Sequence, residues 1–127
     1  MKKVTGLDDS DFKKLGSGDR VTVGKVDVTC LHTPGHTPGS QCFMIGNKLV
    51  SGDTLFVQGC GRVDLPGGDS DEMWRTLTQK FASLPDDTIL YPGHQYSPEA
   101  SAPLGQVKQS NHYMQVRSLD DWRRIMG

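Results

Sequence analysis

The strongest constraint in this sequence is a loop at residues 32–39, in which the tetrapeptide His-Thr-Pro-Gly occurs twice in succession. Proline fixes its own φ angle and disfavours helical geometry in the residue before it, while glycine permits positive φ and a close approach of other backbone. Two prolines and two glycines so close together define a shaped turn. The histidines of such a turn are held in place by the backbone, as a metal centre requires.

Strand-like segments lie on both sides of this loop. Residues 20–31 predict a β-hairpin with a Gly24-Lys25 turn, and residues 41–51 predict a second one with a Gly46-Asn47 turn. In both, apolar and β-branched runs surround a two-residue turn that contains glycine. A nearly all-apolar run over residues 88–91 has the pattern of a buried interior strand. A pair of consecutive hairpins and a later strand are therefore expected.

The clearest helix is predicted over residues 69–83. Asp69 as N-cap and Glu72 three positions later resemble a capping box. An apolar stripe at helical spacing comes next, and it contains Met73, Leu77 and Phe81.

The last third of the chain predicts shorter helices. Residues 97–99 indicate a helix start, but Pro103 and Gly105 divide this helical region into two short pieces. A final helix is expected after Ser118, with a packing face made of Leu119, Trp122 and Ile125.

Length and charge exclude several classes of protein. A chain of 127 residues supports one domain at most. Residues 1–18 are a polar lead-in, and the domain is expected over residues 19–127. The formal net charge is −1 and no block of lysine or arginine stands out, so no nucleic-acid or membrane-surface partner is expected. No apolar run reaches the roughly 20 residues of a membrane span, and the N-terminus lacks a signal-peptide pattern. A cytoplasmic protein is the expectation.

Cysteine usage gives no structural framework. The three cysteines, Cys30, Cys42 and Cys60, are an odd number and form no Cys-x-x-Cys pair. Neither a disulfide network nor a zinc knuckle is therefore indicated. Cys30 and Cys42 fall in strand patterns and are expected to be buried thiols.

Three side chains with metal-ligating chemistry, His36, Asp53 and His94, lie in glycine-flanked loops next to predicted strands. Neutral imidazole and carboxylate suit zinc, iron or manganese, and catalytic sites use such ligands and leave positions open for water. The alternative for the histidines is a structural role, in which the ring donates to backbone. For Asp53 the alternative is a turn-forming aspartate.

Motifs in a fixed order carry a resemblance to a known family. His-Thr-Pro-Gly-His-Thr-Pro-Gly-Ser at 32–40, Ser-Gly-Asp-Thr-Leu-Phe at 51–56 and Tyr-Pro-Gly-His at 91–94 resemble the third, fourth and fifth metal-binding motifs of the metallo-β-lactamase superfamily. The resemblance is greatest to its glyoxalase II-like hydrolases and persulfide dioxygenases. It extends over residues 19–127 and is strengthened by Gly-Cys-Gly-Arg at 59–62 and Leu-Pro-Gly-Gly-Asp at 65–69.

The resemblance implies a role for each candidate ligand. His36 would ligate a first metal, Asp53 would bridge two metals as the catalytic carboxylate, and His94 would ligate the second. His32 occupies a non-ligand place. In a glyoxalase II-like enzyme the metals, zinc or alternatively iron or manganese, lower the pKa of water to about 7 for attack on a thioester carbonyl.

Two further positions match places where relatives contact their substrate. Arg62 and Tyr96 are the residues concerned. By this resemblance the substrate would be a small thioester or another thiol conjugate.

The same resemblance implies an α+β fold, namely half of an αββα sandwich with one mostly antiparallel sheet and helices on one face. Complete members carry His-x-His-x-Asp-His in an N-terminal half, and this sequence contains no such motif. Residues 19–127 thus correspond to the C-terminal half of the domain. The other face of the sheet is expected to be exposed, or covered by a homodimer partner or a separate N-terminal half.

This incomplete ligand set is compatible with three functions. The first is a metal-dependent thioester hydrolase half that is inactive alone. The second is a persulfide-dioxygenase-like mononuclear iron site, with His36 and Asp53 as two members of a 2-His-1-carboxylate triad. The third is a catalytically inert, oligomerising interaction module.

Overall fold

The structure, a computed structural model, describes residues 6, 8, 10 and 13–126. Much of the polar lead-in predicted for residues 1–18 falls on positions outside this description. The part from residue 13 to residue 19 forms neither helix nor strand.

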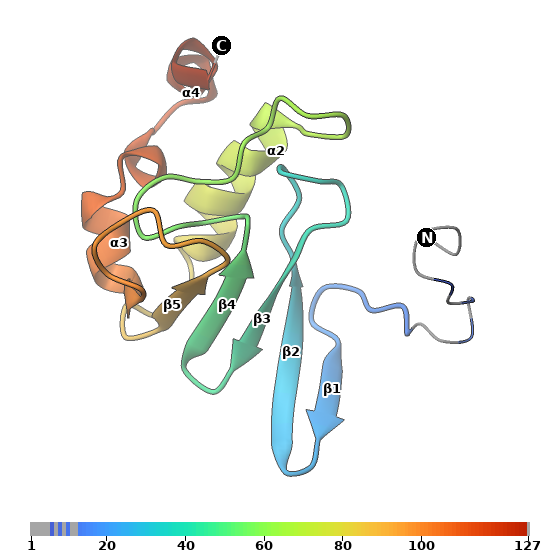
Figure 1. The fold of residues 1–127 in the computed structure, drawn as a ribbon. Helices are drawn as coiled ribbons and strands as arrows, with labels where there is room; N and C mark the ends of the chain where they lie inside the picture. Colours follow the sequence, from blue (N-terminus) through green and yellow to red (C-terminus); the bar gives the residue numbers. More distant parts are fainter. Residues whose placement is uncertain (1–5, 7, 9, 11–12, 127) are drawn as a thin grey trace.

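A six-stranded mixed sheet forms the body of the described chain, and its strands lie side by side in sequence order (Figure 1). All neighbouring strands are antiparallel except β4 and β5, which run parallel. The mostly antiparallel sheet expected from the sequence is therefore confirmed. The strands are β1 (Arg20–Val23), β2 (Val26–His32), β3 (Gln41–Ile45), β4 (Lys48–Gly52), β5 (Ile89–Pro92) and β6 (Ala102–Pro103).

Both predicted hairpins are confirmed. The β1–β2 pair turns at Gly24 and the β3–β4 pair at Gly46, with φ angles of +63° and +60°. A residue with a side chain loses roughly 1–2 kcal/mol in this left-handed conformation, so glycine fixes both the place of the turn and the register.

The helix predicted over residues 69–83 begins as expected. The Asp69 carboxylate accepts the Glu72 N–H at 3.0 Å and caps α2 (Ser70–Arg75). From Thr76 to Phe81 the helix becomes the π-helical segment η2 and ends there, two residues earlier than predicted. The predicted apolar stripe is confirmed, because its side chains are all fully buried: Met73, Leu77 and Phe81.

The C-terminal helices are α3 (Leu104–Ser110), the 3₁₀-helix η3 (His112–Gln115) and α4 (Leu119–Met126). The predicted helix start at residues 97–99 is wrong, because that segment is irregular. Gly105 does not break a helix but lies in the first turn of α3, where a Cβ would be 2.8 Å from the Cβ of Asp86. Glycine there permits a close approach. In α4 Trp122 is buried as predicted, whereas Ile125 is 46% exposed and does not belong to the packing face.

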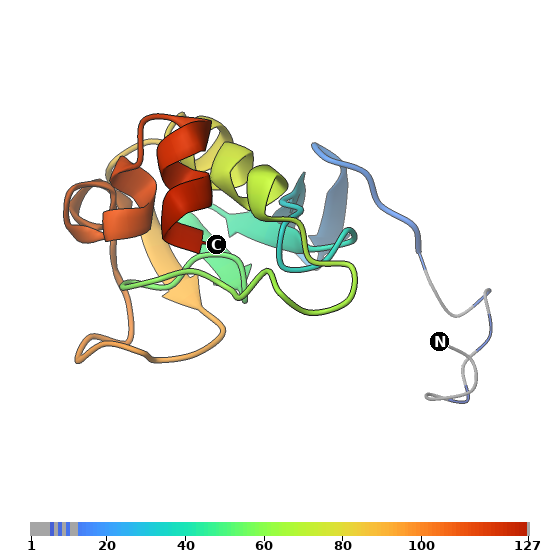
Figure 2. The same cartoon turned by 90° about the horizontal axis from the view of Figure 1, so that it is seen from above.

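The helices cover one face of the sheet (Figure 2). Leu49 of β4 and Leu90 of β5 point into the core between the layers and are fully buried. Val50 and Tyr91, the next residues in each strand, face the other way and are 38% and 39% exposed. Among the described residues, no helix is both long and apolar enough to span a membrane.

Candidate functional site

Loops at one end of the sheet deliver the side chains predicted as ligands (Figure 1). His36 lies in the loop after β2, Asp53 comes directly after β4, and His94 comes after β5. Because β4 and β5 are parallel, their carboxyl ends meet at the same edge, which places Asp53 near His94. All three side chains line one pocket of about 320 Å³. The other residues that line it are Phe56, Cys60, Gly61, Arg62 and Tyr96.

A main-chain carbonyl orients His36. The ring Nδ1 lies 2.7 Å from the carbonyl oxygen of Arg62. Since a carbonyl oxygen only accepts, Nδ1 carries a proton, and in the neutral ring Nε2 is then the nitrogen with the lone pair. Nε2 faces Oδ2 of Asp53 at 3.9 Å, and the side chain of His36 is 22% exposed. An imidazole held through one nitrogen, with the other free, is the usual state of a metal-ligating histidine.

The loop around this histidine is attached to the helix behind it. The Asp69 N–H donates to the Gly35 carbonyl, and the Thr76 hydroxyl donates to the Pro34 carbonyl, each at 2.8 Å. Gly35 has a φ of +146°, and a Cβ on it would lie 2.7 Å from the Cα of Met73. The position of the first candidate ligand therefore depends on α2 and η2 as much as on its own turn.

The remaining histidines lie outside this pocket. Nε2 of His32 is 2.8 Å from the Pro38 carbonyl oxygen, which closes the loop on itself. The carbonyl of His32 accepts a hydrogen bond of 2.6 Å from Nζ of Lys80. His112 is exposed on η3.

Asp53 and His94 are in direct contact. Nδ1 of His94 donates to Oδ1 of Asp53 at 2.7 Å. The side chain of His94 is 52% exposed and that of Asp53 is 39% exposed. Two glycines approach Asp53 closely. A Cβ added at Gly93 would lie 2.8 Å from Oδ1 of Asp53. A Cβ added at Gly61 would lie 1.8 Å from the carbonyl oxygen of Asp53. Sequence reasoning found the glycine-rich segment but not this contact.

Aromatic rings surround His94. Tyr96 stacks on it, with 5.2 Å between ring centroids and 11° between ring planes. Phe56 meets both rings edge-on, at 6.0 Å and 4.9 Å. Tyr96, predicted as a substrate contact, thus lines the pocket beside a candidate ligand. Phe56 ends the Ser-Gly-Asp-Thr-Leu-Phe motif, but no sequence pattern predicts its contacts with these two rings.

Arg62 lines the pocket, but its charge is already paired. Its guanidinium donates twice to the Asp64 carboxylate, at 2.7 Å and 2.8 Å. Hydrogen bonding from Arg62 lowers the pKa of Asp64 to about 2, and the same contact raises the pKa of Arg62. A substrate anion would have to compete with this exposed ion pair. The clearest contribution of Arg62 to the site is its carbonyl oxygen.

Sequence reasoning missed two residues around the site. Cys60 lines the pocket, and burial raises the pKa of its thiol to about 12, so the thiol stays protonated near neutral pH. Asn111 is buried, and its Nδ2 donates to the carbonyls of Phe56 and Gly59, each at 3.0 Å. Asn111 thereby holds the segment that carries Phe56 and Cys60. No local pattern relates it to residues so distant in sequence.

The donors fit a metal in kind, although they do not close around one. Imidazole Nε2 and carboxylate oxygen suit zinc, iron and manganese. Oδ1 of Asp53 is bonded to His94, and Oδ2 lies 3.9 Å from His36. Within the described part of the chain, no three His, Cys, Asp or Glu side chains are placed to hold a metal ion together. The pocket thus contains part of a donor set.

Comparison with known proteins places these residues in a family. The sequence model of the metallo-beta-lactamase superfamily matches residues 2–94. The beta-lactamase hydrolase-like protein of Agrobacterium fabrum is 35% identical, over 97% of this chain and 34% of its own length. The hydroxyacylglutathione hydrolase of Polaromonas is 42% identical over 74% of this chain and 35% of its own length. The crystal structure of ETHE1 from Myxococcus xanthus matches with a TM-score of 0.84 and 34% identity, over 89% of this chain and 50% of that one.

Other matches have a metal in their descriptions. The probable polyketide biosynthesis zinc-dependent hydrolase BaeB of Bacillus velezensis is 29% identical over 84% of this chain. The structure of TTHA1623, in a di-iron-bound form, matches with a TM-score of 0.67 and 34% identity over 80% of this chain. The chain spans between about a third and a half of the length of the curated relatives it matches first.

Proposed function

Because the chain belongs to the metallo-beta-lactamase superfamily, we propose that it supplies the C-terminal half of the active domain of a metal-dependent thioester hydrolase. The observation that carries this proposal is the convergence of His36, Asp53 and His94 on one pocket. Relatives named hydroxyacylglutathione hydrolase support a thiol-conjugate substrate.

Each residue has a proposed part in the reaction. His36 would hold a metal through its Nε2, Asp53 would offer its carboxylate, and His94 would hold a second metal. A bound metal would supply Lewis-acid activation and would lower the pKa of water to about 7. Tyr96 packs on His94 and borders the substrate, and Arg62 binds the thiol conjugate at the rim.

A second polypeptide half is the other part of the proposal. The helix-free face of the sheet exposes large apolar side chains, a feature typical of interaction surfaces. A separate N-terminal half, or a second copy of this chain in a homodimer, would cover this face and add the missing donors. The exposed apolar residues include Val23, Val26, Val50 and Tyr91.

Metal retention tests the ligand assignment without any activity. The chain is loaded with zinc and desalted, and bound metal is measured by mass spectrometry. His36→Ala is expected to weaken retention at least about tenfold, since second-shell changes alone cost 10–100-fold. His112→Ala, a histidine outside the pocket, is the matched control and should retain wild-type metal. Equal retention in both variants would contradict the assignment.

Activity and mass test the need for a second half. The isolated, metal-loaded chain is expected to hydrolyse S-lactoylglutathione at a rate close to the uncatalysed one. Ordinary enzymatic turnover would overturn the incomplete-site proposal. A strictly monomeric, well-folded chain would count against coverage of the sheet face by a second copy.

A mononuclear iron site is the second candidate. One matched structure is in a di-iron-bound form, which supports iron as the metal but not a single ion. Oxygen uptake on a persulfide by the iron-loaded chain would favour oxidation over hydrolysis. A metal-free dimer whose fold is unchanged by His36→Ala and Asp53→Ala would favour the inert interaction module.

A further inference from the structure

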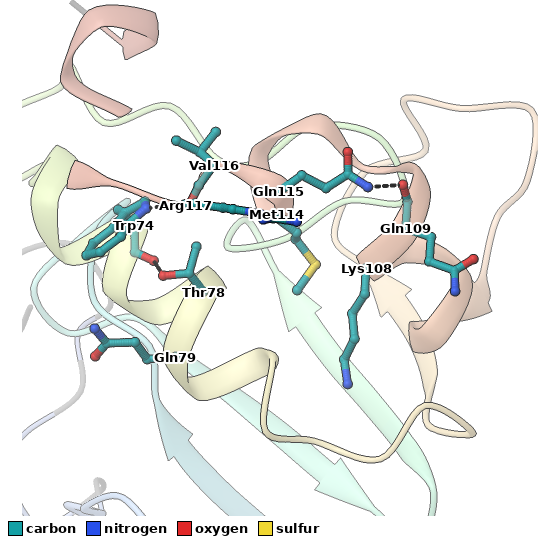
Figure 3. A pocket seen from close by; sticks show the side chains of 9 residues that line it. All are labelled: Trp74, Thr78, Gln79, Lys108, Gln109, Met114, Gln115, Val116 and Arg117. Carbon is teal, nitrogen blue, oxygen red and sulfur yellow. Dashed lines mark hydrogen bonds between the residues drawn. The ribbon is translucent and has the colours of Figure 1, made fainter. Parts of the chain in front are cut away.

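A second cavity, larger than the pocket around Asp53, lies in the helical layer away from the metal-type residues. It is a groove of about 700 Å³ between η2, α3 and η3 (Figure 3), against about 320 Å³ for the pocket around Asp53. The groove is open to solvent, and none of its lining residues belongs to the proposed site. It is therefore a separate feature.

The floor of the groove is apolar and fixed. Trp74 donates its indole N–H to the Val116 carbonyl at 2.9 Å, and Val116 is buried. Trp74 and Met114 both pack against the hydrophobic core and line the groove. A flat ring and a flexible thioether form a surface that accepts apolar side chains of different shapes.

The rim of the groove is polar and positively charged. Lys108 and Arg117 line it, and no acidic side chain does. Lys108 is already bonded to the Leu84 carbonyl and to Asp86. Arg117, in contrast, has no ion pair or hydrogen bond from its side chain within the described residues. The guanidinium is thus available to an anion.

Amide groups on opposite walls complete the rim. Gln79 comes from η2 and Gln109 from α3. Neither side-chain amide is hydrogen-bonded among the residues that the structure describes. An amide has both donors and an acceptor, so it matches the N–H and C=O of a peptide unit.

We propose that this groove binds a short, extended, acidic segment of a partner protein. The carboxylate pairs with Arg117, where a charge-assisted bidentate contact is the strongest available. The peptide backbone bonds to the amides of Gln79 and Gln109, and an apolar side chain packs on Trp74. The open shape favours a peptide over a small ligand, since small-molecule sites enclose most of their ligand.

Selection from a random heptapeptide phage library on the immobilised chain supplies the probe, with counter-selection against Arg117→Glu. The expected result is enrichment of sequences that combine acidic and apolar residues. Failure to enrich any sequence over the variant would overturn the proposal.

The two tryptophans then show where the selected peptide binds. In a ¹⁵N-labelled chain the indole N–H signal of Trp74 should shift, whereas that of Trp122, fully buried and bonded to Ser70, should not. Arg117→Gln should weaken binding about tenfold, or 1.4 kcal/mol. Lys25→Gln, the same charge change on an exposed hairpin turn, is the control and should bind like the wild type.

Other occupants give different results, and each would overturn the proposal. Inorganic phosphate that displaces the peptide at similar affinity would indicate a small anion. A Trp74 shift that depends on protein concentration without peptide would indicate a second copy. Binding that is equal in Arg117→Gln and wild type would remove the charge-complementarity argument.

Discussion

The tripeptide Pro-Gly-His occurs twice, at residues 34–36 and 92–94, and its two copies differ in their support. In the first, proline and glycine are buried and His36 is 22% exposed. In the second, glycine and histidine are exposed, and His94 is 52% exposed. The first turn is bonded to α2 and η2, while the second is bonded to the Gly52 carbonyl and to Asp53 and stacks on Tyr96. The same local sequence is therefore buried where a helix packs behind it and exposed where none does.

Gly35→Ala should have the largest effect, because its Cβ would overlap the backbone of Met73 and its φ is +146°. We expect a loss of about 3 kcal/mol in the free energy of unfolding, measured with urea. Gly39→Ala in the same loop is the control, since a Cβ there meets nothing within 4 Å. A loss of less than about 0.5 kcal/mol is expected for it. Equal losses would show that the helix does not brace this turn.

Thr76→Val should cause the second-largest loss of unfolding free energy. This nearly isosteric change removes the buried hydroxyl that donates to the Pro34 carbonyl. The expected loss of unfolding free energy is about 1–2 kcal/mol. The matched control is Thr78→Val, whose hydroxyl bonds, among the described residues, only to the Trp74 carbonyl one helical turn earlier. If Thr78→Val costs as much, the difference between the two turns does not come from this bond.

Tyr96→Ala should affect the second turn alone. The ring is 63% exposed, so the free energy of unfolding should change by less than about 0.5 kcal/mol. His94 loses its stacking partner, and its imidazole NMR signals should show greater mobility, while those of His36 stay unchanged. Unaltered His94 signals would mean that stacking on Tyr96 does not hold the His94 ring.

Arg62→Gln should have the smallest effect on stability, because both side chains of the Arg62–Asp64 pair are more than half exposed to solvent. The pKa of Asp64, about 2 in the wild type, should rise towards 3.8 in an NMR titration. Because folding lowers the pKa of Asp64, the ion pair adds to the free energy of unfolding at pH values above 3.8. This contribution is lost as the pH falls towards 2. His36 should keep its signals, because it is bonded to the main chain of Arg62. A shifted His36 would contradict that.

Local signals in the sequence predicted much of this fold. Gly24 and Gly46 mark the hairpins because positive φ leaves glycine as the favoured residue, and Asp69 marks the helix start because its carboxylate caps a free N–H. The helix start predicted at residues 97–99 was wrong, since that segment is irregular. Gly105, interpreted as a helix breaker, is instead required where α3 contacts Asp86, a tertiary contact that no local pattern reveals.

The site was predictable only in part, for the same reason. Motif order predicted His36, Asp53 and His94, and the structure brings them into one pocket. The partners that orient them are distant in sequence: a carbonyl at Arg62 and the buried amide of Asn111. Whether the three residues bind metal together remains a prediction, which the metal-retention experiment tests.

The order of the strands also bears on how the chain assembles. Four of the five strand contacts are antiparallel, and the β1–β2 and β3–β4 pairs close through tight turns. The parallel contact between β4 and β5 needs a crossover that includes α2 and η2, and closing such a long connection costs more entropy. We therefore expect hairpins to form early and this contact late. Asp53 and His94 meet only across it, so the pocket should be the last part of the domain to become ordered.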